Sequence, residues 1–453
     1  MMNQYALPIN GTPVSSKVKP FRTLHYLGSK LRLLDFIKTV VDEVDPKGGG
    51  ICDLFSGSGA VAQHFSKERK VVSVDIQEYS RVICSALLNP FDDSPVYEFA
   101  EKIREASFCS EYLSKIAPII DIERRVLHGD FSSSLETVCD FLESCSLYSQ
   151  ILLPRHDINP LFKKPLLETA SNIWPANKHK FLVTSYFGGV FFSFKQAAEL
   201  DVILNGLNFV DLKYHDLLKA SVLSTASDIV NTVGKQFAQP IRPRNKSGEP
   251  KKGLLSQLNK DRSLEVFPIF SEWVERYATN KVGRFSHKVV CSDFRAAIDS
   301  LENDVSVVYA DPPYTRDHYS RFYHGLETLA RMDFPEISMT NLGDRSELSR
   351  GLYRKDRHQS DFCIKSRAVS AFNDLFYKVS SKQKVLLLSY SPYEKDKGSH
   401  PRVVELEFLL DMASKHFNSV ELRSMGKFSH SKLNRTDLHL KAGDTAEVLI
   451  VCR

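Results

Sequence analysis

The chain has 453 residues, of which 42% are hydrophobic and 25% charged, and its formal net charge is +5. This composition is typical of a globular protein with two or three domains, and it excludes a disordered or fibrous chain. Eight scattered cysteines without metal-ligand spacing argue against structural zinc and a disulfide framework, so no metal is predicted. The amino terminus does not match a signal peptide, and the most apolar stretch, 181–194, is too short to cross a bilayer. We therefore expect a cytoplasmic protein without a membrane partner.

The first predicted helix follows the segment Tyr26-Leu-Gly28-Ser29-Lys30, because apolar residues recur at helical spacing from 33 to 44. A helix start offers free N–H groups, and here it also carries a lysine. The segment therefore suits a bound carboxylate or phosphate. An exposed helix cap with a solvated lysine is the alternative.

A strand, a glycine turn and a helix are predicted from residue 51 to residue 65. The segment Asp53-Leu-Phe55-Ser56-Gly57-Ser58-Gly59 has the layout of a nucleotide site in which glycines let the backbone approach a ligand. A second strand, 70–76, ends in Asp75-Ile76, about where such a unit needs an acid to bind ribose hydroxyls. The full G-x-G-x-x-G fingerprint is absent, so a nucleoside without a pyrophosphate fits better than NAD.

Residues 77–284 do not alternate simply between strand and helix. We expect helices at 96–116 and 132–142 and a buried aromatic segment at 181–194. The excess charge is local, because residues 235–262 contain eight Lys or Arg and two acidic residues, a net charge of +6.

Within that basic stretch, prolines and glycines interrupt residues 239–253, which predicts a mobile loop and not a helix face. Basic and amide side chains in such a loop suit phosphate contacts and base edges. A solvated charged surface is the alternative. The candidate DNA-binding residues here are Arg242, Arg244, Asn245, Lys246, Lys251 and Lys252.

A proline corner, Asp311-Pro312-Pro313-Tyr314, follows a predicted strand at 305–310, and its prolines prevent both strand pairing and helix continuation. The Asp311 carboxylate and the Pro312 carbonyl offer two acceptors for an exocyclic amine, and Tyr314 can stack on a flat heterocycle. An ordinary surface turn is the alternative.

A strand just upstream of the corner begins at 288 and ends in Asp293-Phe294. There the carboxylate can accept the amine of a cofactor adenine while the ring packs on its face. A helix cap is the alternative for Asp293.

Cations and aromatic rings are dense immediately after the corner, which favours contact with an unstacked base. The candidates there are His318, Tyr319 and Arg321, and residues 352–358 form a further basic loop. Strands at 385–390 and 446–451, with an amphipathic helix at 406–416 between them, are predicted to complete the sheet.

Five of these motifs, in this order, resemble the Dam-type (alpha-class) adenine-N6-specific DNA methyltransferases. Residues 26–30 are similar to the amino-terminal motif of that family, 53–59 to its cofactor loop, and Asp75 to its ribose acid. Asp293-Phe294 is similar to the cofactor-adenine motif and residues 311–314 to the catalytic motif.

The resemblance implies an α/β fold with a Rossmann-like, seven-stranded sheet and S-adenosyl-L-methionine as cofactor. It implies two halves of a methyltransferase domain, 1–84 (cofactor half) and 286–453 (catalytic half), separated by an inserted target-recognition region at 85–285. The partner would be double-stranded DNA, which makes the protein nucleoid-associated, and its companion would be a cognate restriction endonuclease or another defence system.

The function implied is methyl transfer to the N6 amine of an adenine that is flipped out of the duplex. Two alternatives stay open. One keeps the fold and changes the acceptor to cytosine N4 or to RNA, and the other is a DNA-binding module that retains the cofactor pocket without turnover. All of these hypotheses require that the glycine turn near 57 and the proline corner near 312 open onto one cleft.

Overall fold

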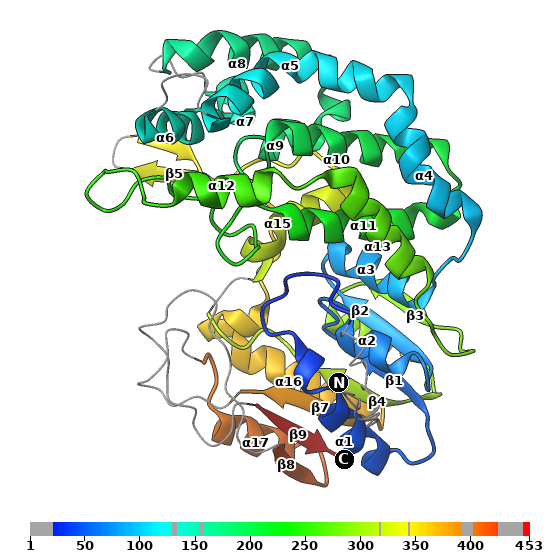
Figure 1. Cartoon of the computed structure of the whole chain (residues 1–453). Coiled ribbons are helices and arrows are strands. Elements are labelled where there is room, and N and C mark those ends of the chain that lie inside the picture. Colours follow the sequence, from blue (N-terminus) through cyan, green and yellow to red (C-terminus); the bar gives the residue numbers. More distant parts are fainter. Residues whose placement is uncertain are drawn as a thin grey trace, which may run out of the picture.

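The computed structural model describes residues 21–128, 134–153, 158–316, 319–342, 345–391, 402–424 and 447–453. The chain forms a lower part built on a sheet and an upper part built from helices (Figure 1). Among the described residues, no helix combines the length and the apolarity that crossing a bilayer requires.

The lower part contains a mostly parallel sheet of seven strands in the order β3-β2-β1-β4-β7-β9-β8. Only β9 runs antiparallel to its neighbours β7 and β8. The strands predicted from apolar runs that end in acidic or turn residues are confirmed. Their bounds are β1 Gly50–Asp53, β2 Val71–Asp75, β3 Lys288–Cys291, β4 Val305–Ala310, β7 Val385–Tyr390 and β9 Val448–Cys452. The seventh strand, β8 Val420–Ser424, was not predicted at this position.

Helices cover both faces of this sheet, because strands such as β1 and β9 are buried throughout and need apolar partners on each side. On one face lie α1 (Leu34–Val44) and α2 (Ala60–Phe65). On the other lie α14 (Phe294–Asp299), α16 (Lys365–Ser381) and α17 (Leu406–Ser414), the last of which confirms the predicted amphipathic helix.

The upper part has a separate apolar core, to which both the middle of the chain and two flanking helices contribute. The flanking helices are α3 (Glu78–Leu88) and α15 (Tyr319–Arg331). The others are α4 Ser94–Glu105, α5 Ser107–His128, α6 Leu135–Ser144, α7 Leu147–Leu152, α8 Pro160–Ile173, α9 Leu182–Phe187, α10 Phe194–Gly206, α11 His215–Ile229, α12 Leu254–Arg262 and α13 Val266–Ala278.

Short elements complete the fold. An antiparallel hairpin, β5 (Met339–Leu342) with β6 (Arg345–Leu348), follows α15 and belongs to the upper part in Figure 1. Short 3₁₀ helices occur at η1 Lys30–Arg32, η2 Lys178–Lys180, η3 Leu207–Phe209, η4 Leu212–Tyr214 and η5 Asp361–Cys363.

The structure corrects the single helix predicted for 96–116. Ala106 is extended (φ −64°, ψ 139°) and separates α4 from α5, a break that the continuous apolar spacing concealed. The helix predicted for 132–142 begins at Leu135, and residues 132–133 lie outside the described residues. The aromatic segment 181–194 is buried as predicted, in α9 and the turn before α10.

The stretch 239–253 is a loop, as predicted, but it is folded back on itself. Arg244 and Pro250 form an isolated β-bridge. The Asn245 side-chain oxygen accepts hydrogen bonds from the N–H groups of Ser247 (2.9 Å) and Glu249 (3.0 Å). Residues 254–262, which we counted in the same basic stretch, form helix α12.

Candidate active site

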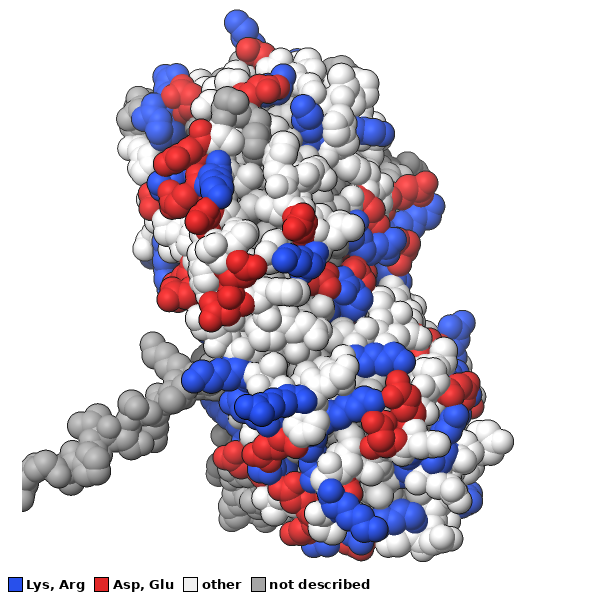
Figure 2. Space-filling model, turned by 90° about the vertical axis from the view of Figure 1, so that its right-hand side faces the viewer, with Lys and Arg blue, Asp and Glu red and all other residues white. Residues whose placement is uncertain are grey.

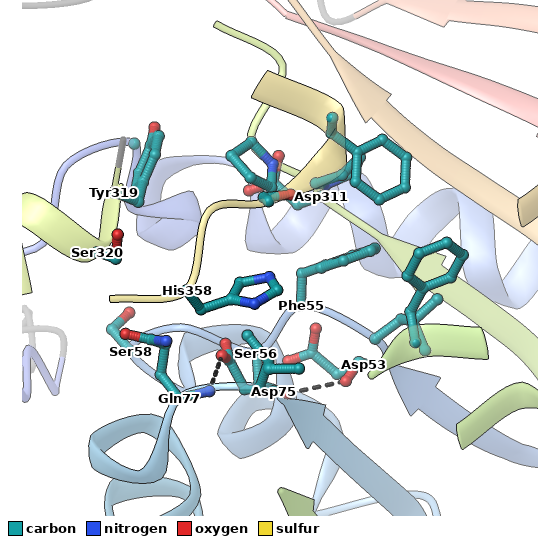
Figure 3. Close-up of a pocket in the computed structure, with 18 of the residues that line it drawn as sticks. Asp53, Phe55, Ser56, Ser58, Asp75, Gln77, Asp311, Tyr319, Ser320 and His358 are labelled. Atoms are coloured by element: carbon teal, nitrogen blue, oxygen red, sulfur yellow. Dashed lines mark hydrogen bonds between the residues drawn. The ribbon is translucent and has the colours of Figure 1, made fainter. Parts of the chain in front are cut away.

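Three acidic residues meet at one edge of the sheet because they follow three adjacent strands. Asp53 ends β1, Asp75 ends β2 and Asp311 follows β4, and these parallel strands are neighbours in the order β2-β1-β4. The strand order reverses at this point, where open α/β sheets place their ligands. Figure 3 shows Asp311 across the pocket from Asp75.

The glycine turn and the proline corner open onto one cavity, as the functional hypotheses require. Its volume is about 140 Å³, roughly ten times the space that one water molecule needs on the same measure. A ligand with several rings therefore fits. The predicted site residues that line it are Tyr26, Gly28, Ser29, Lys30, Asp53, Phe55, Ser56, Asp75, Ile76, Asp293, Phe294, Asp311, Pro312, Pro313, Tyr314 and Tyr319.

Lys30 is the residue whose position differs most from the prediction. It does not stand free at a helix start, because its ammonium lies 2.8 Å from an Asp311 oxygen and 2.7 Å from a Glu447 oxygen. The Lys30 and Glu447 side chains are 7% and 5% exposed, so this ion-pair cluster is buried. Two carboxylates share one cation, which leaves the cluster with one excess negative charge.

The cluster changes the acidity of its members. Burial raises the pKa of Asp311 to about 6, and Lys30 opposes this shift while Glu447 adds to it. Burial alone would lower the pKa of Lys30, but Asp311 and Glu447 raise it well above its usual value. The cation therefore stays charged beside a carboxyl group that titrates close to neutral pH.

Asp53 and Asp75 also hold the backbone of the glycine turn. Asp53 accepts a hydrogen bond from the Ala62 N–H (3.0 Å), and Asp75 accepts one from the Gly57 N–H (2.9 Å). Burial raises the pKa of both carboxyl groups, that of Asp53 to about 7. At neutral pH, Asp53 is therefore poorly stabilised as an anion.

The glycines of the turn have a structural role that the sequence did not indicate. A Cβ on Gly57 would lie 2.6 Å from the Tyr26 hydroxyl oxygen, and one on Gly59 would lie 2.6 Å from Leu87. Both glycines also have positive φ angles. They are needed for close packing against protein side chains, whereas Ser56 and Ser58 line the cavity, and contact of either glycine with a cofactor stays a prediction.

Aromatic rings form one wall of the cavity. The Phe55 ring lies 5.8 Å from that of Phe294 and 5.5 Å from that of Phe362, measured between centroids. Asp293 caps α14, with its carboxylate accepting a hydrogen bond from the Arg295 N–H (2.9 Å). The alternative reading of Asp293 as a cap therefore holds, and its contact with an adenine amine stays a prediction.

At the proline corner, the strand ends at Ala310 and the backbone turns away as predicted. Within the described part of the chain, no group donates a hydrogen bond to the Pro312 carbonyl. The Tyr314 ring packs 4.9 Å from the Tyr390 ring, and the Arg402 guanidinium lies 5.0 Å from its centroid. The corner thus presents a free acceptor next to the Asp311 carboxylate.

The predicted DNA-binding residues fall into three groups. Tyr319 lines the cavity, and His318 lies outside the described residues. Arg244 is already neutralised by Glu136, Asp140 and Glu143, and Asn245 closes its own turn, so neither projects freely from the loop. The exposed members are Arg242, Lys246, Lys251 and Lys252, and Arg321 is half-buried.

The described residues on the face drawn in Figure 2 do not form a uniformly cationic surface. The face drawn in Figure 2 carries Lys and Arg interspersed with Asp and Glu over both parts of the molecule. The net charge of the basic stretch is therefore a poor guide to where an anionic partner binds.

Several cavity residues, Phe362 among them, escaped the sequence analysis, as did Glu447, which contacts Lys30. Phe362 lies in η5, after a loop without apolar periodicity, and Glu447 directly precedes the last strand. A lone acid at the start of a strand carries no local signal. It matters because the strand order places β9 beside β7, next to β4 and Asp311.

Comparisons with known proteins agree with this geometry. The family described as D12 class N6 adenine-specific DNA methyltransferase matches residues 26–149 and 257–390, together more than half of the chain. The unmatched residues between these two segments include α8 to α11 and the loop 239–253.

Curated relatives include the modification methylase LlaI of Lactococcus lactis subsp. lactis, 25% identical over 86% of this chain and 48% of the relative. The type II methyltransferase M.FokI of Planomicrobium okeanokoites is 24% identical over 81% of this chain and 44% of its own length. The chain thus spans about half the length of the relatives it matches. On the extent of the family match, the chain belongs to the D12 class N6 adenine-specific DNA methyltransferases.

Proposed function

We propose that this protein transfers a methyl group from S-adenosyl-L-methionine to the exocyclic N6 amine of adenine in a specific sequence of double-stranded DNA. The observation that supports this most strongly is the cavity, which joins the glycine turn, the acid at the end of β2 and the proline corner. Family membership supports the same reaction class.

The residues present fit the proposed cofactor. The cavity is lined by five carboxylates and by the Phe55 and Phe294 rings, and the Lys30–Asp311–Glu447 cluster, which includes the lining residues Lys30 and Asp311, holds excess negative charge. A flat, cationic nucleoside matches this combination of charge and aromatic surface. When bound, S-adenosyl-L-methionine would supply an electrophilic methyl group. Asp75 would face the ribose hydroxyls, and Asp293 with Phe294 the adenine.

The protein's own part in the reaction is to hold the target amine. The Asp311 carboxylate and the Pro312 carbonyl would accept one hydrogen bond each from the amine, while Tyr314 stacks on the base. Accepting both bonds draws the nitrogen lone pair out of conjugation with the ring. Asp311 then takes the proton that the amine loses, and the neighbouring ammonium of Lys30 keeps this carboxylate ionised until that step.

In this proposal the seven-stranded sheet is a Rossmann-like methyltransferase sheet with halves 1–84 and 286–453. Residues 85–285 form an inserted target-recognition region, and the adenine reaches the cavity by base flipping. A cognate restriction endonuclease would be the companion protein, in keeping with the modification methylases among the relatives.

The test is to incubate the purified protein with methyl-labelled S-adenosyl-L-methionine and duplex DNA of mixed sequence, and to identify the modified base after digestion. N6-methyladenine is the expected product. N4-methylcytosine, or label in RNA alone, would move the assignment to the alternative acceptors. Cofactor and DNA binding without transfer to any nucleic acid would favour the binding module.

A further inference from the structure

Three arginines near Tyr353 lack the acidic partners that the buried cations Lys30, Arg69, Arg262 and Arg354 have, although Arg321 and Arg357 are only half-buried and Arg350 is exposed. They are Arg321 on α15 and Arg350 and Arg357 in the segment after β6. In the part of the chain that the structure describes, no carboxylate oxygen lies within 4.0 Å of any of them. By contrast, the adjacent Arg354 is paired with both Asp333 and Asp356.

A single tyrosine holds two of these cations in place. The Arg321 and Arg357 guanidinium groups lie 5.3 Å and 5.1 Å from the centroid of the Tyr353 ring. The Tyr353 hydroxyl donates a hydrogen bond to the Ala238 carbonyl, which fixes the ring. Two like charges are thus positioned by one aromatic side chain and not by an anion.

The hydrogen bonds of these arginines are incomplete. The Arg321 Nε is buried and has no partner among the described residues, and a buried donor without an acceptor is costly. Arg350 donates to the Ile241 carbonyl (2.8 Å), and Arg357 donates to the Arg354 carbonyl (2.6 Å), which are neutral acceptors. None of these hydrogen bonds brings a negative charge to the guanidinium groups.

The surroundings of two of these groups disfavour their charged forms on balance. Burial and Arg321 lower the pKa of Arg357, while Tyr353 and Asp356 act in the opposite direction. Burial and Arg242 likewise lower the pKa of Arg350, against the opposing effect of Glu143. An anion bound between these groups would relieve both the desolvation and the repulsion.

Two of the arginines are chain neighbours of residues that line the cavity, and Arg350 lies near the same Tyr353. The lining residues concerned are Ser320 and His358, and Figure 3 shows Ser320 with Tyr319 on the side away from Asp53 and His358 between them and Phe55. Arg321 directly follows Ser320, and Arg357 directly precedes His358. The chain at Arg321 and at Arg357 therefore reaches the rim of the cavity.

We propose that Arg321, Arg350 and Arg357 form a clamp for the phosphodiester backbone of duplex DNA beside the flipped adenine. This inference rests on the proposed function. Guanidinium groups bind phosphate oxygens in a bidentate way, and several at one rim match the spaced charges of a backbone better than a single small anion. Arg350 and Arg357 were not among the residues that the sequence suggested.

The test measures the affinity for a duplex oligonucleotide as a function of salt concentration, with S-adenosylhomocysteine present. Each phosphate contact that is lost lowers the slope of log K against log salt by about 0.9. We therefore expect each of Arg321→Gln, Arg350→Gln and Arg357→Gln to reduce the slope by about one and the triple variant by about three. The Arg→Lys variants, which keep the charge, should retain most of the slope.

Arg331→Gln is the matched control, because Arg331 lies on the same helix but is paired with Asp333 and Asp356. Its slope should equal that of the wild type, and S-adenosylhomocysteine binding should be preserved in every variant. A triple variant with the wild-type slope, in a protein that still methylates DNA, would overturn the clamp alone. Tighter binding of single-stranded RNA than of duplex, lost in the triple variant, would also overturn it.

Failure of the proposed function gives a different result. In that case the wild-type protein would bind S-adenosylhomocysteine but would neither bind nor methylate duplex DNA at any salt concentration. The clamp would then fail together with the proposed function, because the wild-type protein itself would bind no duplex DNA.

Discussion

The helical part and the carboxyl edge of the sheet use buried charges in opposite ways. In the core of the helical part, several buried cations meet acids in closed pairs, such as Arg262 with Glu123 and Lys235 with Asp261. At the sheet edge, Asp53, Asp75 and Asp311 face a cavity, and one lysine serves both Asp311 and Glu447. Closed pairs stabilise one conformation, whereas the open edge keeps negative charge available for a ligand and a proton.

The strongest test of this contrast is Asp311→Asn at the open edge. The change keeps the size of the side chain but replaces one acceptor oxygen by an NH2 group, which cannot accept a bond from the target amine. Single-turnover methyl transfer should fall by about 10²–10⁴-fold, the range for loss of a group that handles a proton. Binding of duplex DNA and of S-adenosylhomocysteine should persist. A rate close to that of the wild type would remove Asp311 from the proposed chemistry.

The matching test of a closed pair is Arg262→Met in the helical part. Arg262 and Glu123 are 3% and 5% exposed, and the change leaves the Glu123 carboxylate buried without its cation. Breaking such a pair typically costs about 3–5 kcal/mol. Urea unfolding followed by fluorescence would measure the loss.

The control for this test is Arg104→Met, which removes an exposed pair with Glu101. Exposed pairs are worth about 0–1 kcal/mol, so this variant should unfold close to the wild type. Equal urea midpoints for the two variants would mean that the buried pair stabilises the helical part no more than a surface pair does.

Glu447→Gln tests whether the negative charge of Glu447 raises the pKa of Asp311. The proposed reaction needs the ionised Asp311, whose pKa is raised to about 6, so the rate should decline as the pH falls through that value. Removing the negative charge of Glu447 favours ionisation of Asp311 and lowers its pKa. The acid limb of the rate profile should therefore move to lower pH, with rates several-fold above those of the wild type on that limb.

Glu447→Asp, which keeps the charge, should leave the acid limb close to its original position. Tyr309 and Tyr314 also face the Lys30 cluster, but tyrosine titrates far above this range. An acid limb that does not move in Glu447→Gln would show that Glu447 does not influence Asp311 during the reaction.

The smallest effect is expected for Arg244→Gln, which compares a neutralised arginine of the basic stretch with the unpaired arginines at the cavity. Because Arg244 already contacts three acids, its loss should leave the salt dependence of DNA binding unchanged. Combined replacement of Lys246, Lys251 and Lys252 by Gln tests the rest of the loop. If that variant also keeps the wild-type slope, the loop is a solvated surface.

Local patterns were sufficient to predict the strands that carry the site. The apolar runs before Asp53, Asp75 and Asp311 are short and end in turn residues, and all three form parallel strands. The order of the motifs along the chain was sufficient for the family. These features depend on residues that are neighbours along the chain, so the sequence alone is enough to predict them.

Contacts between distant segments could not be predicted in this way. The pairing of Lys30 with Glu447 and the closure of Arg244 on α6 depend on which strands and helices become neighbours in space. The same holds for the unpaired arginines around Tyr353, since a cation's partners are visible only after packing has placed every carboxylate. Sequence therefore specified which chemical groups the protein has, and packing specified which of their charges remain free.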